Sequence, residues 1–390
     1  MKLPIYLDNN ATTPVDERVL ARMLPFFTEH YGNASSKGHP HGWAAEEAVE
    51  QAREAVAACL GAEVQEIFFT SGATEAINAA LKGVAGAYAR KGRHLVTVQT
   101  EHKAVLDTCR ALERQGFAVT YLPVHANGLV DLDELDAALT DETILVAVMG
   151  ANNETGVLQP IPEIAERVRA RGILFMTDAT QAVGKVPVSV SHADLMVCSG
   201  HKVYGPKGVG ALYARRRHPR VRLLPLVDGG GQERGLRGGT LNVPGIVGMG
   251  VALEIAYAER QAEAARLEAL RDRFEASLLD HLPDVQVNGQ TAPRLPQTAN
   301  IAFRGVEAAK LVLALRDLAV STGSACTSGS GKPSHVLQAM GLPDEDALAT
   351  IRFSLGRFTT AEEIDYAIEH VIAAVEQVRE ETAFTKSEIL

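Results

Sequence analysis

Short apolar runs rich in β-branched and aromatic residues alternate with helical or loop-like segments between residues 66 and 213, and this alternation constrains the fold most. Such alternation is typical of a mostly parallel sheet covered by helices. We therefore expect an α/β fold. The strand-like runs are Glu66–Phe69, His94–Val98, Val119–Leu122, Ile144–Val148, Ile173–Met176, Leu195–Cys198 and Gly210–Tyr213.

The last third of the chain has a different pattern. Residues 244–282 are rich in Ala, Glu, Leu and Arg, which predicts one or two long helices that bridge two domains. The alternation that follows predicts a smaller α+β domain. We expect a large domain over residues 15–259 and a small domain built from 1–14 and 260–390. The runs of the small domain are Asn300–Arg304, Glu307–Asp317, Thr350–Ser354 and Ala361–Val378.

The composition, 46% hydrophobic and 22% charged over 390 residues, is that of a globular protein with a substantial core. A net charge of -10 argues against a nucleic-acid-binding surface. The chain start lacks an apolar signal core and no stretch approaches a membrane span, so we expect a cytoplasmic protein that contacts no membrane. Its cysteines form no C-x-x-C pair, so no metal site is expected. The polar tail Glu380–Leu390 is expected to be frayed.

A lysine, Lys202, follows the strand-like run Leu195–Cys198 within the segment Ser199–Gly208. Ligands of open α/β sheets bind at the carboxyl ends of strands, and a lysine in a partly dry pocket loses its proton readily enough to form a Schiff base with a carbonyl cofactor. A solvated surface lysine is the alternative, and this segment alone leaves both open. A Walker A loop does not match, because Pro206 precedes Lys207 and the Gly-Lys-Ser/Thr order is missing.

Two further strand ends carry polar groups of complementary chemistry. Thr70–Glu75 leads from a strand into a helix, which predicts a phosphate site with the Thr74 hydroxyl as a further donor; a plain N-cap is the alternative. Asp178 and Gln181 follow another strand. Asp178 suits a protonated pyridine nitrogen, which it would keep cationic, although an aspartate there also suits a cap of the following turn.

His102 follows a fourth strand and is suited to stacking on a flat ring, with a satisfied structural histidine as the alternative. Asn152–Gly156, after a fifth strand, supplies amide donors or forms a turn. Phosphate donor, acidic partner, imidazole and lysine thus all follow strand ends. Their convergence predicts a pyridoxal 5′-phosphate site.

Two residues of the expected small domain stand out. Cys326 lies in Ser321–Gly331, which contains no bulky residue and so predicts an accessible, reactive thiol; a linker with an incidental cysteine is the alternative. Arg352 lies between apolar neighbours in a strand-like run, where an unpaired guanidinium is costly. Either a substrate carboxylate or an internal Asp or Glu could pair with the guanidinium and offset that cost.

Together these motifs resemble the cysteine desulfurases of the IscS/NifS kind, in the class V aminotransferase family of fold-type I pyridoxal-phosphate enzymes. The resemblance runs along the whole chain. It implies a mostly parallel seven-stranded sheet with helices on both faces, a homodimer, and conversion of L-cysteine to L-alanine with a persulfide on Cys326. The motifs are Tyr6–Pro14, Gly32-Asn33, Ser71–Thr74, Asn152–Gly156, Asp178–Gln181, Ser199–Gly208, Gly229–Gly235, Ser321–Gly331 and Ile351–Arg357.

The resemblance also implies a role for each site residue. Lys202, Cys326 and His102 are expected to be catalytic: Lys202 holds the cofactor and moves the α-proton, Cys326 attacks the substrate sulfur, and His102 stacks on the ring. Substrate binding is expected from Asn153, Arg352 and Asn33. The residues expected to bind the cofactor are Ala73, Thr74, His102, Asn153, Asp178, Gln181, Ser199, His201 and Lys202, with Thr240 of the partner subunit.

The persulfide is expected to pass to an iron–sulfur scaffold or another sulfur-acceptor protein, with transient ligation of a 2Fe–2S cluster by Cys326. Lys332 departs from the usual Leu-Glu after the cysteine loop, and the tail after Thr385 lacks the longer extension of the housekeeping form, so the acceptor stays open between iron–sulfur assembly and tRNA thiolation. Other class V activities, aminotransferase or selenocysteine lyase, and a non-catalytic interaction platform are the alternative functions; Cys326 discriminates among them.

Overall fold

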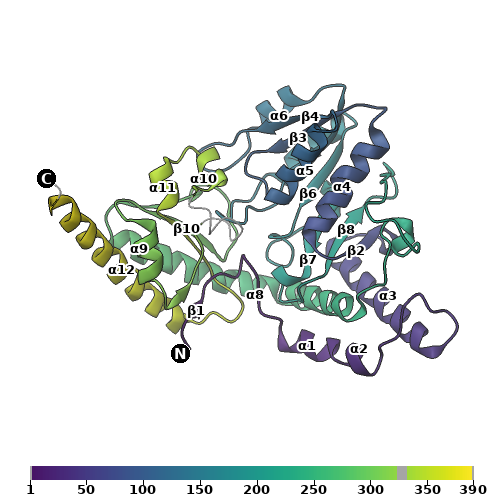
Figure 1. Ribbon diagram of the computed structural model, residues 1–390, viewed down its shortest axis with the longest axis horizontal. Helices are drawn as coiled ribbons and strands as arrows, with labels where there is room; N and C mark the ends of the chain where they lie inside the picture. The colour runs from purple at the N-terminus through teal and green to yellow at the C-terminus, as the bar shows by residue number, and fades with distance from the viewer. Residues whose placement is uncertain (1, 323–331, 389–390) are drawn as a thin grey trace.

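The computed structural model describes residues 2–322 and 332–388. Its largest sheet has seven strands in the order β2-β8-β7-β6-β5-β3-β4, visible at the right of Figure 1. All pairs from β7 to β4 are parallel, whereas β8 is antiparallel to both of its neighbours. The expected sheet is confirmed, strand for strand. Its strands are β2 (Ile67–Thr70), β3 (His94–Val98), β4 (Ala118–Leu122), β5 (Thr143–Ala147), β6 (Leu174–Asp178), β7 (Leu195–Ser199) and β8 (Gly210–Ala214).

Helices cover both faces of this sheet because alternate strand residues enter opposite clusters. In β7, Leu195 and Val197 pack with apolar residues of α4 (Ala73–Tyr88) and α5 (Lys103–Glu113). Met196 and Cys198 pack on the other face with residues of α1, α3, α6, α7 and α8. Because both faces of the sheet are buried, its strands are continuous apolar runs in the sequence. The bounds are α1 (Glu17–Met23), α2 (Pro25–Thr28), α3 (Pro40–Leu60), α6 (Leu132–Ala138) and α7 (Ile161–Ala170).

A second, smaller sheet is antiparallel in the order β12-β10-β9 and has its own apolar cluster. That cluster includes Ile5 and Leu7 of the N-terminal segment, where β1 pairs in parallel with β11. The expected α+β arrangement is therefore present. The elements are β1 (Ile5–Tyr6), β9 (Val285–Val287), β10 (Thr298–Phe303), α9 (Ala308–Ala314), β11 (Leu318–Ala319), α10 (His335–Ala339), α11 (Asp344–Leu348), β12 (Thr350–Ser354) and α12 (Ala361–Glu388).

One helix of 39 residues, α8 (Val243–His281), joins the two sheets. Its first half packs Ile246 and Leu253 into the large-sheet cluster, and its second half packs Phe274 and Leu278 against the small sheet. At 1.5 Å per residue it spans about 58 Å, and it runs through the lower middle of Figure 1. The sequence predicted one or two helices here, and the structure has one.

The expected frayed tail is wrong as far as Glu388, because α12 continues to that residue and reaches the C-terminal label in Figure 1. Residues 380–388 contain Glu, Ala and Lys and neither Gly nor Pro, a composition that favours helix. Among the helices of the described residues, none is both long and apolar enough to cross a bilayer.

Candidate active site

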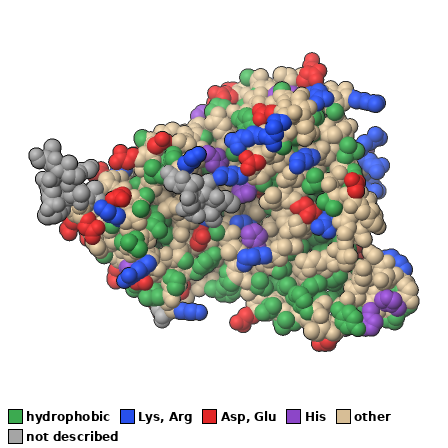
Figure 2. All heavy atoms as spheres, in the orientation of Figure 1, with side chains coloured by type: hydrophobic (Ala, Val, Ile, Leu, Met, Phe, Trp, Pro, Cys, Tyr) green, Lys and Arg blue, Asp and Glu red, His purple; other side chains and the backbone are tan. Residues whose placement is uncertain are grey.

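Five strands of the large sheet, β2, β3, β5, β6 and β7, deliver residues to one cavity of about 540 Å³. This volume is within the range of about 300–1,000 Å³ found for small-molecule sites. Figure 2 shows Lys, Arg and His side chains gathered near the middle of the displayed face. The predicted site residues that line the cavity are Ala73, Thr74, His102, Asn153, Asp178, Gln181, Ser199, His201, Lys202 and Arg352.

Helix α4 begins at the cavity without a side-chain cap. Its N-cap is Gly72, which has no side chain, and Thr74 lies inside the first turn. The segment Thr70–Glu75 thus contains the N-cap that the alternative expected, but no side chain caps the helix. Because Ala73 and Thr74 line the cavity, the positive end of a 16-residue helix faces it. Such an end binds anions through its unpaired amides.

Asp178 is the last residue of β6 rather than a loop residue after it. Its side chain is buried and its Oδ1 accepts a hydrogen bond from the Thr180 amide at 2.9 Å. The turn interpretation is thus confirmed, and Asp178 also lines the cavity, where pairing with a pyridine nitrogen stays a prediction. No lysine or arginine of the described chain forms an ion pair with it. A buried carboxylate at a cavity wall without an ion-pair partner is suited to a cationic ligand.

Lys202 lies in the 3₁₀ turn Gly200–Lys202 and is partly buried. Its Nζ donates to the carbonyl oxygens of Asn10 and Ala11, each at 2.6 Å. The Asn10 oxygen also accepts from Gln181 Nε2 at 2.9 Å. The N-terminal segment is thus part of the cavity wall. Reasoning from single residues missed it; its only signal was the polar, nearly uncharged run Tyr6–Pro14, quoted as a motif.

His102 is the N-cap of α5, and its Nδ1 accepts a hydrogen bond from the Ala104 amide at 3.1 Å. Burial lowers the pKa of His102 despite the opposing charge of Asp178. The ring is therefore neutral near pH 7, and because Nδ1 is an acceptor the proton lies on Nε2. His102 is both the structural residue and the cavity residue that the sequence left as alternatives.

Burial shifts the pKa of two more groups near the cavity. It raises the pKa of the Glu101 carboxyl well above its usual range. Burial, followed by the charge of Lys202, lowers the pKa of His201 to about 4. His201 Nδ1 lies 3.1 Å from Thr12 Oγ1. His201 therefore acts at neutral pH through hydrogen bonds rather than charge.

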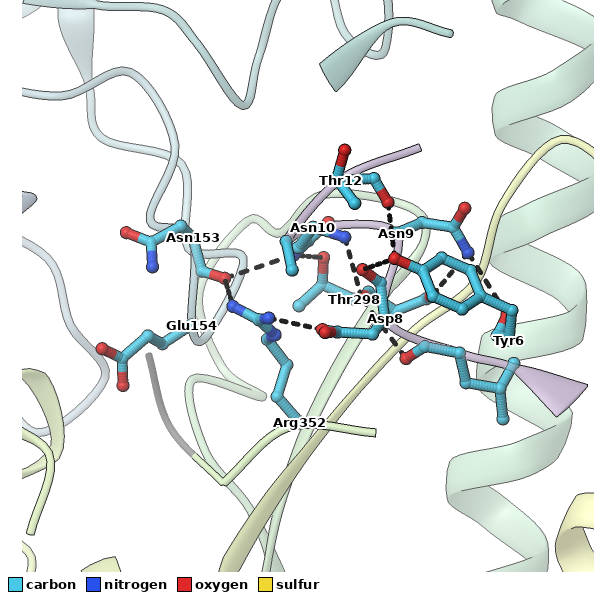
Figure 3. Close-up of polar contacts among 12 residues, drawn as sticks. Tyr6, Asp8, Asn9, Asn10, Thr12, Asn153, Glu154, Thr298 and Arg352 are labelled. Atoms are coloured by element: carbon cyan, nitrogen blue, oxygen red, sulfur yellow. Dashed lines mark hydrogen bonds and ion pairs between the residues drawn. The ribbon is translucent and has the colours of Figure 1, made fainter. Parts of the chain in front are cut away.

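The Arg352 side chain, in β12, is 1% exposed and forms an ion pair with Asp8, the kind of internal acid that the sequence left as an alternative. Its Nη2 lies 2.6 Å from Asp8 Oδ1, and its Nη1 donates to the Asn153 carbonyl oxygen at 2.8 Å; Figure 3 shows both contacts. Its Nε is buried with no partner among the described residues. Arg352 nevertheless lines the cavity.

Two predicted site residues of the described chain are not in the cavity wall. Asn33 and Thr240 are exposed and absent from the lining. For Thr240 this is expected, because its predicted role is in the cavity of the partner subunit. Cys326 lies outside the described residues.

Lys185 is a partly buried lysine that nothing in the sequence singles out. Its Nζ donates to Gln181 Oε1 at 3.0 Å. Because a lysine only donates, this bond orients the Gln181 amide with Nε2 toward Asn10. Burial, followed by the charge of Lys202, lowers the pKa of Lys185 from 10.5 to about 7.

Lys185 should make stability depend on pH in a defined window. Between about pH 7 and about pH 10, Lys185 is protonated in the unfolded chain and neutral in the folded chain, so the free energy of unfolding rises with pH. Below that window Lys185 is protonated in both states, and the folded state carries the full cost of burying its charge. We expect wild type to gain about 1–3 kcal/mol more than Lys185→Met between pH 7 and pH 9.5. Urea unfolding at both pH values measures this; identical pH dependence in the two proteins would contradict it.

Known proteins similar to this chain show its family. The family model of aminotransferase class-V matches residues 5–367. A protein of Anaeromyxobacter sp. (strain Fw109-5) named cysteine desulfurase IscS is 57% identical over 382 residues, which are 97% of this chain and 94% of that protein. A relative with the same name in Klebsiella pneumoniae subsp. pneumoniae is 55% identical over 384 residues.

Solved structures agree with the fold. A NifS-like protein superposes with a TM-score of 0.88 at 40% identity, over 95% of this chain and 99% of its own. SspA in complex with cysteine superposes with a TM-score of 0.81 at 39% identity, over 91% of this chain and all of its own (100%). The chain therefore belongs to the aminotransferase class-V family and, within it, to the cysteine desulfurases.

Proposed function

We propose that this protein is a pyridoxal-phosphate-dependent cysteine desulfurase that converts L-cysteine to L-alanine and takes the sulfur as a persulfide on Cys326. The observation that carries the proposal is the single cavity that joins Lys202, the unpaired acid Asp178 and the uncapped start of α4. A relative solved in complex with cysteine supports the substrate.

The residues present fit pyridoxal phosphate in three independent ways. The uncapped α4 terminus suits its phosphate, Asp178 suits its ring nitrogen, and the Lys202 amine suits its aldehyde. When bound, the cofactor supplies an electron sink for the bond broken at the substrate α-carbon. The other residues proposed to hold it are Ala73, Thr74, His102, Asn153, Gln181, Ser199, His201 and Thr240 of the partner subunit.

The chain's own groups perform the remaining work. Asp178 would pair with the ring nitrogen and so keep its proton in place. His102, neutral with its proton on Nε2, would pack on the ring without adding charge. Arg352 and the side-chain amide of Asn153 would bind the substrate carboxylate, since both residues line the cavity. Asn33, which is outside the lining, stays a predicted third contact. The Lys202 amine would be the base that moves the substrate α-proton.

The other cysteines support Cys326 as the sulfur acceptor. Burial raises the pKa of Cys109 and of Cys198 to about 12 and that of Cys59 to about 11. Each therefore stays a thiol at neutral pH, and the thiolate is the nucleophile in sulfur chemistry. Cys326, in its segment of small residues, is the remaining candidate.

Mass spectrometry after addition of L-cysteine to the cofactor-loaded protein tests this function. The peptide that contains Cys326 is expected to gain one sulfur atom, while the peptides of Cys59, Cys109 and Cys198 are unchanged. A gain on one of those three, or sulfide release with no persulfide, would overturn the assignment of Cys326. Amino-group transfer to a keto acid without sulfur release would favour the aminotransferase alternative.

We further propose a homodimer that passes the persulfide to an iron–sulfur scaffold or another acceptor protein, with transient 2Fe–2S ligation by Cys326. The exposed position of Thr240, away from the cavity of its own chain, supports the dimer. We also propose the division into residues 15–259 and a small domain of 1–14 and 260–390. Separate apolar clusters around the two sheets support it.

A further inference from the structure

The backbone holds Asp8 and Arg352 next to each other. Asp8 forms a parallel bridge with Ser354 of β12, two residues after Arg352, so both side chains lie on the same side of the strand. The Asn9 amide donates to the Ser354 oxygen at 3.1 Å and the Ser354 amide to the Leu7 oxygen at 2.7 Å. The ion pair is thus built into the fold rather than formed by two free surface side chains.

The three nitrogens of the Arg352 guanidinium differ in their partners: one donates to a backbone oxygen, one pairs with a carboxylate, and one has no partner among the described residues. Nη1 binds the Asn153 carbonyl oxygen, Nη2 binds Asp8, and the buried Nε has no partner among the described residues. Asp8 is less buried, with 19% of its side chain exposed. In Figure 3 Asp8 approaches the guanidinium from the side of the N-terminal segment, and the Asn153 side chain points away from it.

A carboxylate that binds an arginine bidentately needs two parallel N–H groups on one edge of the guanidinium. The unused Nε–H shares its edge with Nη2, the nitrogen that Asp8 contacts. A ligand carboxylate on that edge therefore meets a second carboxylate. The negative charge of Asp8 neutralises Arg352, so the pair attracts an anion less than an arginine without an acidic partner would.

We propose that Asp8 is an internal competitor for the α-carboxylate of the amino acid: it neutralises Arg352 in the empty site and weakens binding of substrate and product alike. The inference rests on the proposed function, in which Arg352 takes that carboxylate. Substrate and product carry the same α-carboxylate, so a site that holds it weakly also releases alanine quickly. Asp8 is a positioning residue, since it acts through Arg352.

The test measures carboxylate affinity directly, in the cofactor-loaded protein. Asp8→Asn keeps an oxygen that accepts from Arg352 and removes the charge, whereas Asp8→Glu keeps the charge. The dissociation constant of L-alanine, from calorimetry, is expected to fall about three- to tenfold in Asp8→Asn and to stay near the wild-type value in Asp8→Glu. L-Alaninol lacks the carboxylate, so its affinity is expected to be unchanged in both variants.

Steady-state kinetics gives a second readout. The KM for L-cysteine is expected to fall in Asp8→Asn by the same factor as the alanine constant, while kcat stays equal or falls because release slows. Unchanged or weaker alanine binding by a folded Asp8→Asn protein would overturn the proposal. So would an Arg352→Met protein that binds alanine as wild type does. The persulfide on Cys326 is measured separately, so desulfurase function is judged independently of Asp8.

Discussion

Replacing Lys202 with alanine is expected to lower the rate of alanine formation from L-cysteine by about 10³-fold or more. The variant loses both the covalent attachment point of the cofactor and the group that moves the α-proton. Its fold should persist, because Lys202 is partly exposed and its Nζ donates to backbone oxygens of the cavity wall. Alanine production and the thermal midpoint, measured on the same preparation, check both statements.

A second lysine of the same segment provides a matched control. Lys207 also lines the cavity but is exposed. After borohydride reduction and denaturation, the cofactor should remain on wild type and on Lys207→Ala and be lost from Lys202→Ala. Added methylamine should restore part of the lost turnover to Lys202→Ala, because a free amine replaces the missing base. Full turnover by Lys202→Ala without added amine would contradict the proposed role.

The sheet and the cavity lining could be predicted from the sequence because their signals are local. Each buried strand is a continuous apolar run, and parallel strands present their carboxyl ends at one edge. A polar residue that follows such a run, as Asp178 and Lys202 do, is therefore near the cavity whatever the rest of the fold. The prediction of a frayed tail from Glu380 was wrong as far as Glu388 because it rested on the polarity of these residues and not on their helix propensity.

Contacts between distant parts of the chain could not be predicted in this way. Asp8 and Arg352 are 344 residues apart, and nothing local indicates that they pair. Lys185 looks like an ordinary loop lysine in the sequence, and only burial gives it a lowered pKa. The same holds for Glu101, whose pKa is raised by tertiary burial. Motifs quoted for resemblance alone, such as Gly229–Gly235, also had no physical explanation until the structure supplied partners.

Glu233 explains the motif Gly229–Gly235 structurally, and its replacement is expected to cause the largest loss of stability. Its side chain is 0% exposed and its two oxygens lie 2.8 Å from the Nη atoms of Arg53, which is 4% exposed. Oε2 also accepts from the Phe69 amide at 2.7 Å. These bonds hold Glu233 and Arg234 at positive φ values of 45° and 54°, which favour glycine elsewhere.

Glu233→Ala is expected to lower the free energy of unfolding by about 3–5 kcal/mol, because it leaves the buried Arg53 guanidinium with only the partly exposed Glu50 as an ionic partner. Denaturant unfolding of the cofactor-free protein measures the loss. An exposed pair, Arg110 and Asp107 at 60% and 64% side-chain exposure, supplies the control, and Asp107→Ala should cost less than about 1 kcal/mol. Replacing both buried partners, as Arg53→Met with Glu233→Leu, should recover most of the loss, since no unpaired charge then remains. If Glu233→Ala cost no more than Asp107→Ala, the pair would not hold the Gly229–Gly235 turn in place.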